Sequence, residues 1–577
     1  MASLTRKQFL QAGIAAALTA EAAAAAAAEA PAAKPVKPAP APAGAGMPLA
    51  ALALNRCAFG PRPGDLEAFK KLGATPTARL RAFLEQQLHP ETLADADCER
   101  RLAAANLETL KKTGPELWAD HQVAADKLRD EQKNAPVTTS TGTVAAVAMS
   151  TAAVFSTATR AKVPVNDYQL RAQPVRELES AAWIRAVYSR RQLHEVLVDF
   201  WHSHFSVYAW DAPITATFVP YDRDVIRVHA LGNFRKMLEA VAQSPAMLFY
   251  LDGFINQSGN PNENYARELF ELHTLGAENY LGTKDRREVE GYAQGKPVGY
   301  VDGDVYEAAR ALTGWRVTAG QFEYFEQWHD RFQKIVLASG LQEYQAPLKD
   351  GRDVLDLLAS HPGTAHHVSL RLCRRLVADD PPARLVDAAA KVFLAKKDDP
   401  HQLRAVVKLI VLSPEFAASG GGKLKRPFEA VASALRAGAV EFAPTEGFVN
   451  AFGKMGQRHF QWRTPDGYPD ARDKWAGASS LLERWRLFNQ LAAGGVDGAK
   501  PDWRGQTPAS AKAPAAVVAH WATRLLGRAP SRGVLDEATA FLGQGRNRGY
   551  ELPDDLLRER LGPTIALLLM SPDFQWR

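Results

Sequence analysis

Apolar residues recur at helical spacing over most of the chain, and this periodicity constrains the fold more than any other feature. Residues 193–201 carry one apolar stripe, and residues 403–410 carry another. Few stretches alternate with period two, and residues 320–325 are the clearest candidate strand. We therefore predict a mainly α protein: a large multi-helix globular body with little or no β structure.

Two segments of similar sequence suggest that this body contains two related helical lobes. Residues 409–416 read LIVLSPEF and residues 567–574 read LLLMSPDF. In each, an apolar helix end is stopped by Ser-Pro, because proline disfavours the helical conformation in the residue before it. A single pair falls short of a repeat array, so we predict two lobes rather than a solenoid.

The amino-terminal segment has the layout of an export signal. Residues 1–29 place Arg6-Lys7 and Phe9-Leu10 before an alanine-rich run, which resembles a twin-arginine signal peptide with Lys in place of the second Arg. An alanine-rich leader without a targeting role is the alternative. Residues 30–46 alternate Pro and Ala and should form an extended linker. We predict a periplasmic or secreted protein without a transmembrane span in its mature form.

Composition divides the remainder into a main body and a shorter carboxyl-terminal piece. Residues 47–494 form the main helical body, within which residues 131–165 are rich in Ser, Thr, Ala and Val and should form a surface excursion. Residues 495–515 are rich in Gly, Ala, Pro and Lys and suggest a linker. Residues 516–577 then form a carboxyl-terminal helical segment of the same domain.

Charge and cysteine content exclude some functions. The net charge of +6 is small against 70 basic and 64 acidic residues, and the basic residues form no dense stripe, which disfavours nucleic-acid binding. Cys57, Cys98 and Cys373 include no C-x-x-C pair, which argues against a disulfide framework or a structural zinc site. No P-loop, G-x-G-x-x-G, H-E-x-x-H or G-x-S-x-G element occurs in a suitable context, which disfavours nucleotide-dependent and ordinary serine-hydrolase functions.

Several motifs follow one another in an order seen in one bacterial family. They are LNRCAFG (54–60), DFWHSHFSV (199–207), NENYARELFELHTLG (262–276), DVYEAARALTGW (304–315), KRPF (425–428) and WRTPDGYP (462–469). On these motifs the chain resembles the family catalogued as domain of unknown function 1800 (DUF1800), over roughly residues 50–577. The resemblance implies an exported, mainly helical protein, often encoded beside a sulfatase-like partner, and it implies no established reaction. The family usually has a very short link where this chain inserts the charged loop 281–303.

The first candidate site is Asp199-x-x-His202-x-His204. On a helix, Glu195, Asp199 and His202 fall on one polar face, opposite the apolar stripe. If the helix continues, His204 points to the apolar side; if the chain extends after Trp201, His202 and His204 share a face, as metal-binding H-x-H pairs do. Imidazole and carboxylate suit zinc, iron or copper, so Asp199, His202 and His204 are candidate ligands of a transition metal. The alternative is a helix end whose histidines cap the helix or pack against tryptophans.

The second candidate site is the helix around residues 263–273. Glu263, Arg267 and Glu268 cluster on one side, while His273 falls in the apolar arc. One interpretation is a buried structural salt-bridge cluster organised by Arg267, with His273 as a core residue. The other is an acid/base pair whose pKa values are pushed apart by burial and by Arg267, which makes Glu263, Arg267, Glu268 and His273 catalytic candidates.

These candidates lead to two hypotheses of function. The favoured one is an envelope or secreted enzyme, metal-dependent in one version, that acts on an extracellular polymer or a protein partner. Its single polar site would lie where the His202/His204 segment meets the 263–273 helix, with Glu263 or Glu268 as general base. The rival is a non-catalytic binding or assembly protein of the cell envelope that works with a sulfatase-like partner. Trp462 and Tyr468, in a loop rich in Pro and Gly, would form a sugar platform or a buried clasp.

Overall fold

The computed structural model describes residues 47–134 and 166–577. The predicted signal peptide (1–29), the predicted linker (30–46) and residues 135–165 of the predicted excursion lie outside this part of the chain. None of the helices in these two ranges combines the length and the hydrophobicity of a membrane-spanning segment.

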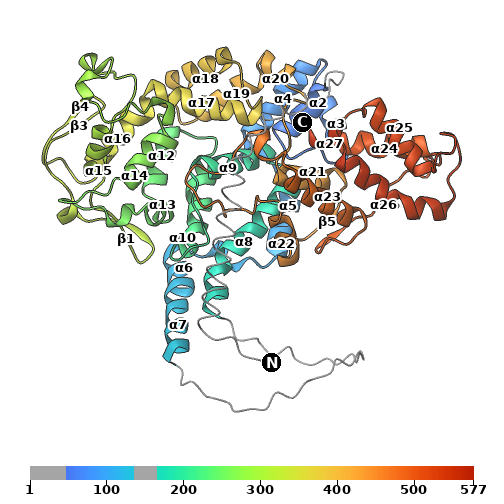
Figure 1. Cartoon of the computed structure of the whole chain (residues 1–577), viewed down its shortest axis with the longest axis horizontal. Coiled ribbons are helices and arrows are strands. Elements are labelled where there is room, and N and C mark those ends of the chain that lie inside the picture. The colour runs from blue at the N-terminus through green and yellow to red at the C-terminus, as the bar shows by residue number, and fades with distance from the viewer. Residues whose placement is uncertain (1–46, 135–165) are drawn as a thin grey trace, which may run out of the picture. The chain divides into compact units, whose positions relative to one another are not determined.

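The described chain is mainly α-helical, which confirms the predicted fold class (Figure 1). Its strands form short antiparallel pairs: β1 (Trp315–Thr318) with β2 (Gln321–Tyr324), β3 (Lys334–Val336) with β4 (Ser339–Leu341), and β5 (Glu441–Phe442) with β6 (Ala499–Lys500). Strand β2 lies within residues 320–325, so the predicted strand is confirmed.

Two hydrophobic cores organise the helices. Helices with buried residues in the first core are α2 (Leu49–Arg56), α3 (Asp65–Lys70), α4 (Pro76–Leu88), α8 (Asp167–Tyr188), α9 (Gln192–His204), α10 (Ile214–Pro220), α12 (Phe234–Ala242), α13 (Pro245–Tyr250), α14 (Asn264–Glu268), α15 (Asp302–Ala311), α16 (Lys349–Ser360), α17 (Pro362–Leu376), α18 (Ala383–Ala395), α19 (Gln402–Val411) and α20 (Pro414–Ala418). The second core is built by α5 (Ala96–Ala104), α21 (Pro427–Ala437), α22 (Glu446–Gly453), α23 (Ala478–Ala492), α24 (Pro514–Leu526), α25 (Arg532–Gly543), α26 (Asp554–Met570) and α27 (Pro572–Gln575). Helices α8 and α9 contribute side chains to both cores.

Short helical segments connect these elements. Three of those described are π-helical: η3 (Trp118–Val123), η4 (Tyr221–Ile226) and η6 (Leu269–His273). The others are α6 (Gly114–Leu117), α7 (Ala124–Asn134), α11 (Arg227–His229), η1 (Pro90–Thr92), η2 (Glu108–Lys111), η5 (Gly253–Ile255), η7 (Ala277–Asn279), η8 (Arg286–Glu288), η9 (Tyr292–Gln294), η10 (Glu326–Trp328) and η11 (Arg472–Lys474). Because a π-turn accommodates an extra residue, it changes the direction in which the following side chains project.

The two similar segments noted in the sequence adopt the same local structure. Helix α19 ends before Ser413 and α26 ends before Ser571; each serine is extended, and a short helix begins at the proline that follows. Phe416 is buried in the first core and Phe574 in the second. Each copy of the motif therefore anchors a helix end in its own core.

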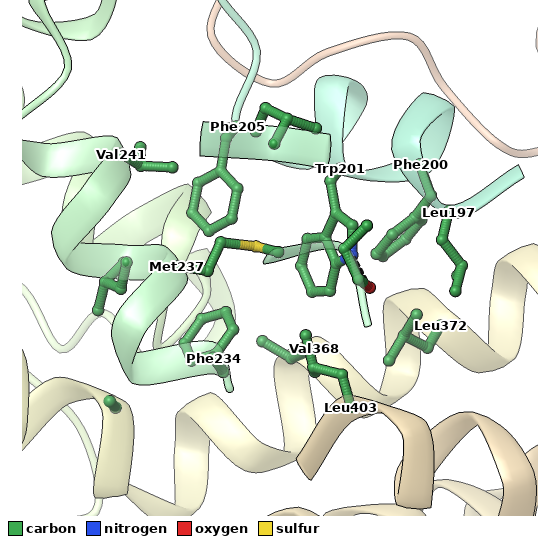
Figure 2. Packing of buried hydrophobic residues seen from close by; sticks show 14 of the residues in the cluster. Leu197, Phe200, Trp201, Phe205, Phe234, Met237, Val241, Val368, Leu372 and Leu403 are labelled. Carbon is green, nitrogen blue, oxygen red and sulfur yellow. Dashed lines mark hydrogen bonds between the residues drawn. The ribbon is translucent and has the colours of Figure 1, made fainter. Parts of the chain in front are cut away.

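Helix α9 is the element on which the first core and the site both depend. Leu197 and Trp201 project into the first core, against Phe234 of α12 and Val368 of α17 (Figure 2). The indole Nε1 of Trp201 donates a hydrogen bond to the Ala230 carbonyl, at 3.0 Å. A buried indole needs such an acceptor, and the contact fixes how α9 is rotated about its axis.

Two segments of unusual composition pack against the body. Residues 495–515, predicted as a linker, contain β6 and the buried Trp503, whose ring meets that of Trp521 at 5.4 Å. The inserted loop 281–303 is closed at its base by backbone hydrogen bonds from Leu281 to Tyr300 (2.8 Å) and from Tyr300 to Asn279 (3.0 Å). Helix α15 follows this loop and begins at Asp302, where the Asp304 carboxylate accepts the backbone N–H of Val301.

Candidate functional site

The polar face of α9 lines a cavity of about 60 Å³, which has room for a few water molecules. The cavity is bounded by α8, by α9, by η4 and α11, and by the segment from Gln457 to Tyr468. Glu195, Asp199 and His202 all line it, as their helical spacing predicted. Trp462 and Tyr468, with ring centroids 4.9 Å apart, line it as well.

His202 is held by a buried carboxylate from the neighbouring π-turn. Its Nε2 lies 2.9 Å from Oδ1 of Asp222, and both side chains are less than a tenth exposed. The ring is surrounded by Phe218, Tyr221 and Phe460, at centroid distances of 5.7, 5.9 and 5.0 Å. Because Asp222 accepts the proton on Nε2, the neutral ring carries its lone pair on Nδ1. No described residue forms a hydrogen bond with that nitrogen.

Asp222 stays ionised because cations surround it. Burial would raise the pKa of Asp222, but the nearby Arg227 and the hydrogen bond from His202 hold it well below its usual value. Arg227 also donates to both carboxylate oxygens of Glu195, at 2.7 and 3.1 Å. Burial would likewise raise the pKa of Glu195, but Arg227 outweighs that effect and lowers it to about 2. A fixed anion behind an imidazole orients the ring and stabilises its protonated form.

Arg185 of α8 places a cation on the same cavity wall. Its guanidinium forms no hydrogen bond or ion pair with a described residue, and it lines this cavity as well as a neighbouring one. Burial, and next the positive charge of Arg227, lower the pKa of Arg185 from its usual value. A guanidinium without a protein partner is available to stabilise negative charge that develops on a bound molecule.

Asp199 belongs to a buried ion-pair network. Its carboxylate accepts hydrogen bonds from Arg375 and Arg426, and both arginines also contact Glu429. Burial would raise the pKa of Asp199, but Arg426 and Arg375 lower it. Two guanidinium groups thus share the Asp199 carboxylate. Asp199 forms no hydrogen bond with His202 or His204, the two histidines nearest to it in sequence.

His204 points away from His202, because α9 continues to His204 and two residues turn the helix by roughly 200°. It is fully buried, and its Nε2 lies 3.1 Å from the backbone carbonyl of His273. The α9 segment and the 263–273 segment therefore do meet, and the contact between His204 and His273 lies in the core. Burial lowers the pKa of His204 well below its usual value and that of His273 to about 3, so both rings are neutral.

The remaining predicted residues lie on or near the surface of the same segment. Arg267 bridges Glu263 (3.0 Å) and Asp302 (3.1 Å), and all three side chains are more than a third exposed, so the predicted arginine network exists but is not deeply buried. Glu268 forms no ion pair with a described residue. Its burial, and next the negative charge of Glu271, raise the pKa of Glu268 to about 7, which suits a group that exchanges protons near neutral pH.

The described residues contain no group of three His, Cys, Asp or Glu side chains arranged to hold a metal ion. The three predicted ligands take different partners: Asp199 two arginines, His202 the Asp222 carboxylate, and His204 a backbone carbonyl. The arrangement fits a histidine base better than a metal centre.

The cavity is completed by four residues that the sequence did not predict: Asp222, Arg227, Arg185 and His459. Asp222 comes from the π-turn η4 and Arg227 from the short helix α11 that follows it, and neither segment has an apolar periodicity of its own. Burial lowers the pKa of His459 to about 4, and its ring packs on Phe428 with centroids 4.3 Å apart. The only available signal was the presence of charged residues in an otherwise apolar stretch.

A family model described as a protein of unknown function (DUF1800) matches residues 52–576. The chain belongs to the DUF1800 family. No curated protein and no solved structure matches the chain. Two of the motifs that resembled this family, residues 199–207 and 462–469, both contribute side chains to the cavity. The family has no established reaction, so function rests on the geometry of the site.

Proposed function

We propose that this DUF1800 protein is an enzyme that uses His202 as a general base in the cavity beside α9. The observation that carries the proposal is the His202–Asp222 pair, at 2.9 Å, in a cavity that is also lined by Arg185, whose guanidinium contacts no described carboxylate. Nδ1 would take a proton from a water molecule or a substrate hydroxyl, and Asp222 would stabilise the resulting imidazolium. Arg185 would stabilise the negative charge that forms on the substrate.

We further propose that the protein acts outside the cytoplasm, on an extracellular polymer or a protein partner. The arginine-containing leader and the Pro/Ala linker support this location. Trp462 and Tyr468 support a substrate with apolar faces, such as a sugar or an aromatic side chain, because their rings line the cavity. Glu268 has a raised pKa but does not line this cavity, so we assign it no role in the proposed reaction.

The proposal is tested by screening the wild-type protein and His202→Gln in parallel on polysaccharides and peptides. We expect an activity in the wild type that falls by about 10²-fold or more in His202→Gln. His366→Gln is the matched control, because His366 is exposed and does not line the cavity. Equal activity in the wild type and His202→Gln contradicts the proposal. No turnover in either favours the rival function, a binding or assembly protein of the cell envelope.

Metal analysis separates this mechanism from the metal-dependent version. Stoichiometric zinc, iron or copper in the wild-type protein, lost in His202→Ala and His204→Ala, would replace the base mechanism with a metal site. We expect no such loss, because the two histidines face opposite sides of α9.

A further inference from the structure

A second cavity, of about 450 Å³, lies on the other side of Ser203 and Tyr468, which line both cavities. One wall is the face of α17 that carries His367, Arg371 and Arg374, and the opposite wall is the loop of residues 466–471. We call this cavity the arginine groove. Its volume lies within the range of pockets that bind small molecules.

Arg371 is one of two arginines in the groove that form no ion pair with a described residue. Its only hydrogen bond to a described residue runs from Nη2 to the Ser203 carbonyl, at 3.3 Å. Burial lowers the pKa of Arg371 only to about 10, so the guanidinium is charged at neutral pH. Arg374, one turn further along α17, is exposed and likewise forms no ion pair with a described residue.

The carboxylates of the groove are engaged elsewhere. Asp379 accepts from Lys423 at 2.6 Å, and Asp466 accepts from the indole Nε1 of Trp462 at 2.8 Å. Asp470 lies 3.5 Å from Lys423 and 3.7 Å from Nη1 of Arg375. None of the three forms a hydrogen bond with Arg371. Asp470 and Asp466 are near enough to favour the charged form of Arg371, but no described carboxylate forms a hydrogen bond or ion pair with it, so its guanidinium is open to a ligand.

A guanidinium in a partly desolvated wall is unfavourable unless acceptors complete its hydrogen bonds, and an anion does so most strongly because it also balances the charge. The planar fork of arginine matches the two oxygens of a carboxylate, sulfate or phosphate group. We propose that the arginine groove binds such an oxyanion group on a ligand, with Arg371 as the principal contact and Arg374 at the rim. The proposal does not depend on His202 being a base, because it concerns binding and not turnover.

The test is isothermal titration calorimetry of the full chain with sodium sulfate, phosphate or acetate, at constant ionic strength set by chloride. We expect saturable one-site binding of at least one of these oxyanions, and Arg371→Gln should weaken it about ten-fold or more. Arg374→Gln should weaken it less, and Arg371→Lys, which keeps the charge without the fork, should have an intermediate effect. Arg532→Gln is the control, because that side chain is 94% exposed and lies outside the groove.

The relative affinities for the three oxyanions identify the chemical group that the groove binds. Preference for sulfate or phosphate identifies a tetrahedral ester group, and preference for acetate identifies a carboxylate. If none of the three oxyanions shows saturable binding up to about 100 mM, the proposal is overturned, because a dissociation constant above that concentration is too high for a specific site. Equal binding by the wild type and Arg371→Gln overturns it as well. Should Arg371→Gln fail to fold, Arg371→Lys and Arg374→Gln carry the same comparison, and unchanged binding in both overturns the proposal.

Discussion

The ion pair between Glu195 and Arg227 holds α9 against the segment that carries Asp222, and Glu195→Gln tests its contribution to stability. The two side chains are 10% and 13% exposed, and Arg227 donates to both oxygens of Glu195. The pKa of Glu195 is about 2 in the folded protein, against 4.5 for a free glutamate side chain. That difference corresponds to about 3 kcal/mol of the free energy of unfolding at neutral pH.

The sign of the pH dependence follows from the lowered pKa. The folded state favours the ionised form of Glu195, so its contribution is complete above pH 4.5 and is lost as the pH falls toward 2. At pH 7, we expect Glu195→Gln to lower the free energy of unfolding by about 3 kcal/mol. At pH 3 the difference should shrink to about half, since the Glu195 carboxylate of the unfolded chain is by then mostly protonated while that of the folded protein is still mostly ionised.

Urea unfolding followed by tryptophan fluorescence measures both differences. Glu263→Gln is the matched control, because the Glu263–Arg267 pair is more than a third exposed and should contribute less than about 1 kcal/mol. A Glu195→Gln effect of the same size at pH 7 and pH 3 would refute the electrostatic explanation. It would show that the substitution acts through packing.

Three further predictions follow from the same structure. Trp201→Ala should lower the free energy of unfolding by about 3–5 kcal/mol in urea titrations, because it leaves a core cavity and removes the hydrogen bond to Ala230. Gly467→Ala should loosen the loop over the cavity, because φ of Gly467 is +73° and the new Cβ would lie 1.9 Å from the Ser203 carbonyl oxygen. The loosening should be measured as faster amide hydrogen exchange across residues 462–471. The pKa of Glu268 is about 7 in the folded protein, above its value in the unfolded chain. The contribution of Glu268 to the free energy of unfolding should therefore fall as the pH rises from 5 to 8. Urea titrations at several pH values should show that Glu268→Gln removes this dependence.

Helical periodicity was sufficient to predict the fold class and one wall of the site. Glu195, Asp199 and His202 share a face because they are separated by four and three residues, and the cavity lies on that face. The same periodicity left the direction of His204 open, since that depended on whether the helix continued past Trp201. It does continue, and the alternative in which His202 and His204 share a face is not adopted.

The other walls of the site could not be predicted, because their residues are brought together by tertiary packing. Asp222 lies on the π-turn η4 and Arg227 begins the three-residue helix α11 after it, and segments this short and irregular leave no periodic signal. Arg185 lies on α8, which contributes to both cores and is therefore apolar around much of its circumference. The sequence of such a helix does not indicate which of the neighbouring helices a charged side chain like that of Arg185 will lie against.

Helix α9 makes stability and site geometry interdependent. Trp201 and His202 are adjacent in sequence, yet one is packed in the first core and the other is bonded to Asp222 at the cavity. A rotation of α9 that moved His202 by 1 Å would move Trp201 by a similar distance within a close-packed core, where voids and overlaps are both costly. The core therefore fixes the orientation of the imidazole, and Asp222 fixes its proton. A base held in this way loses little entropy when a substrate binds, which is the property that a catalytic histidine needs and a purely structural one does not.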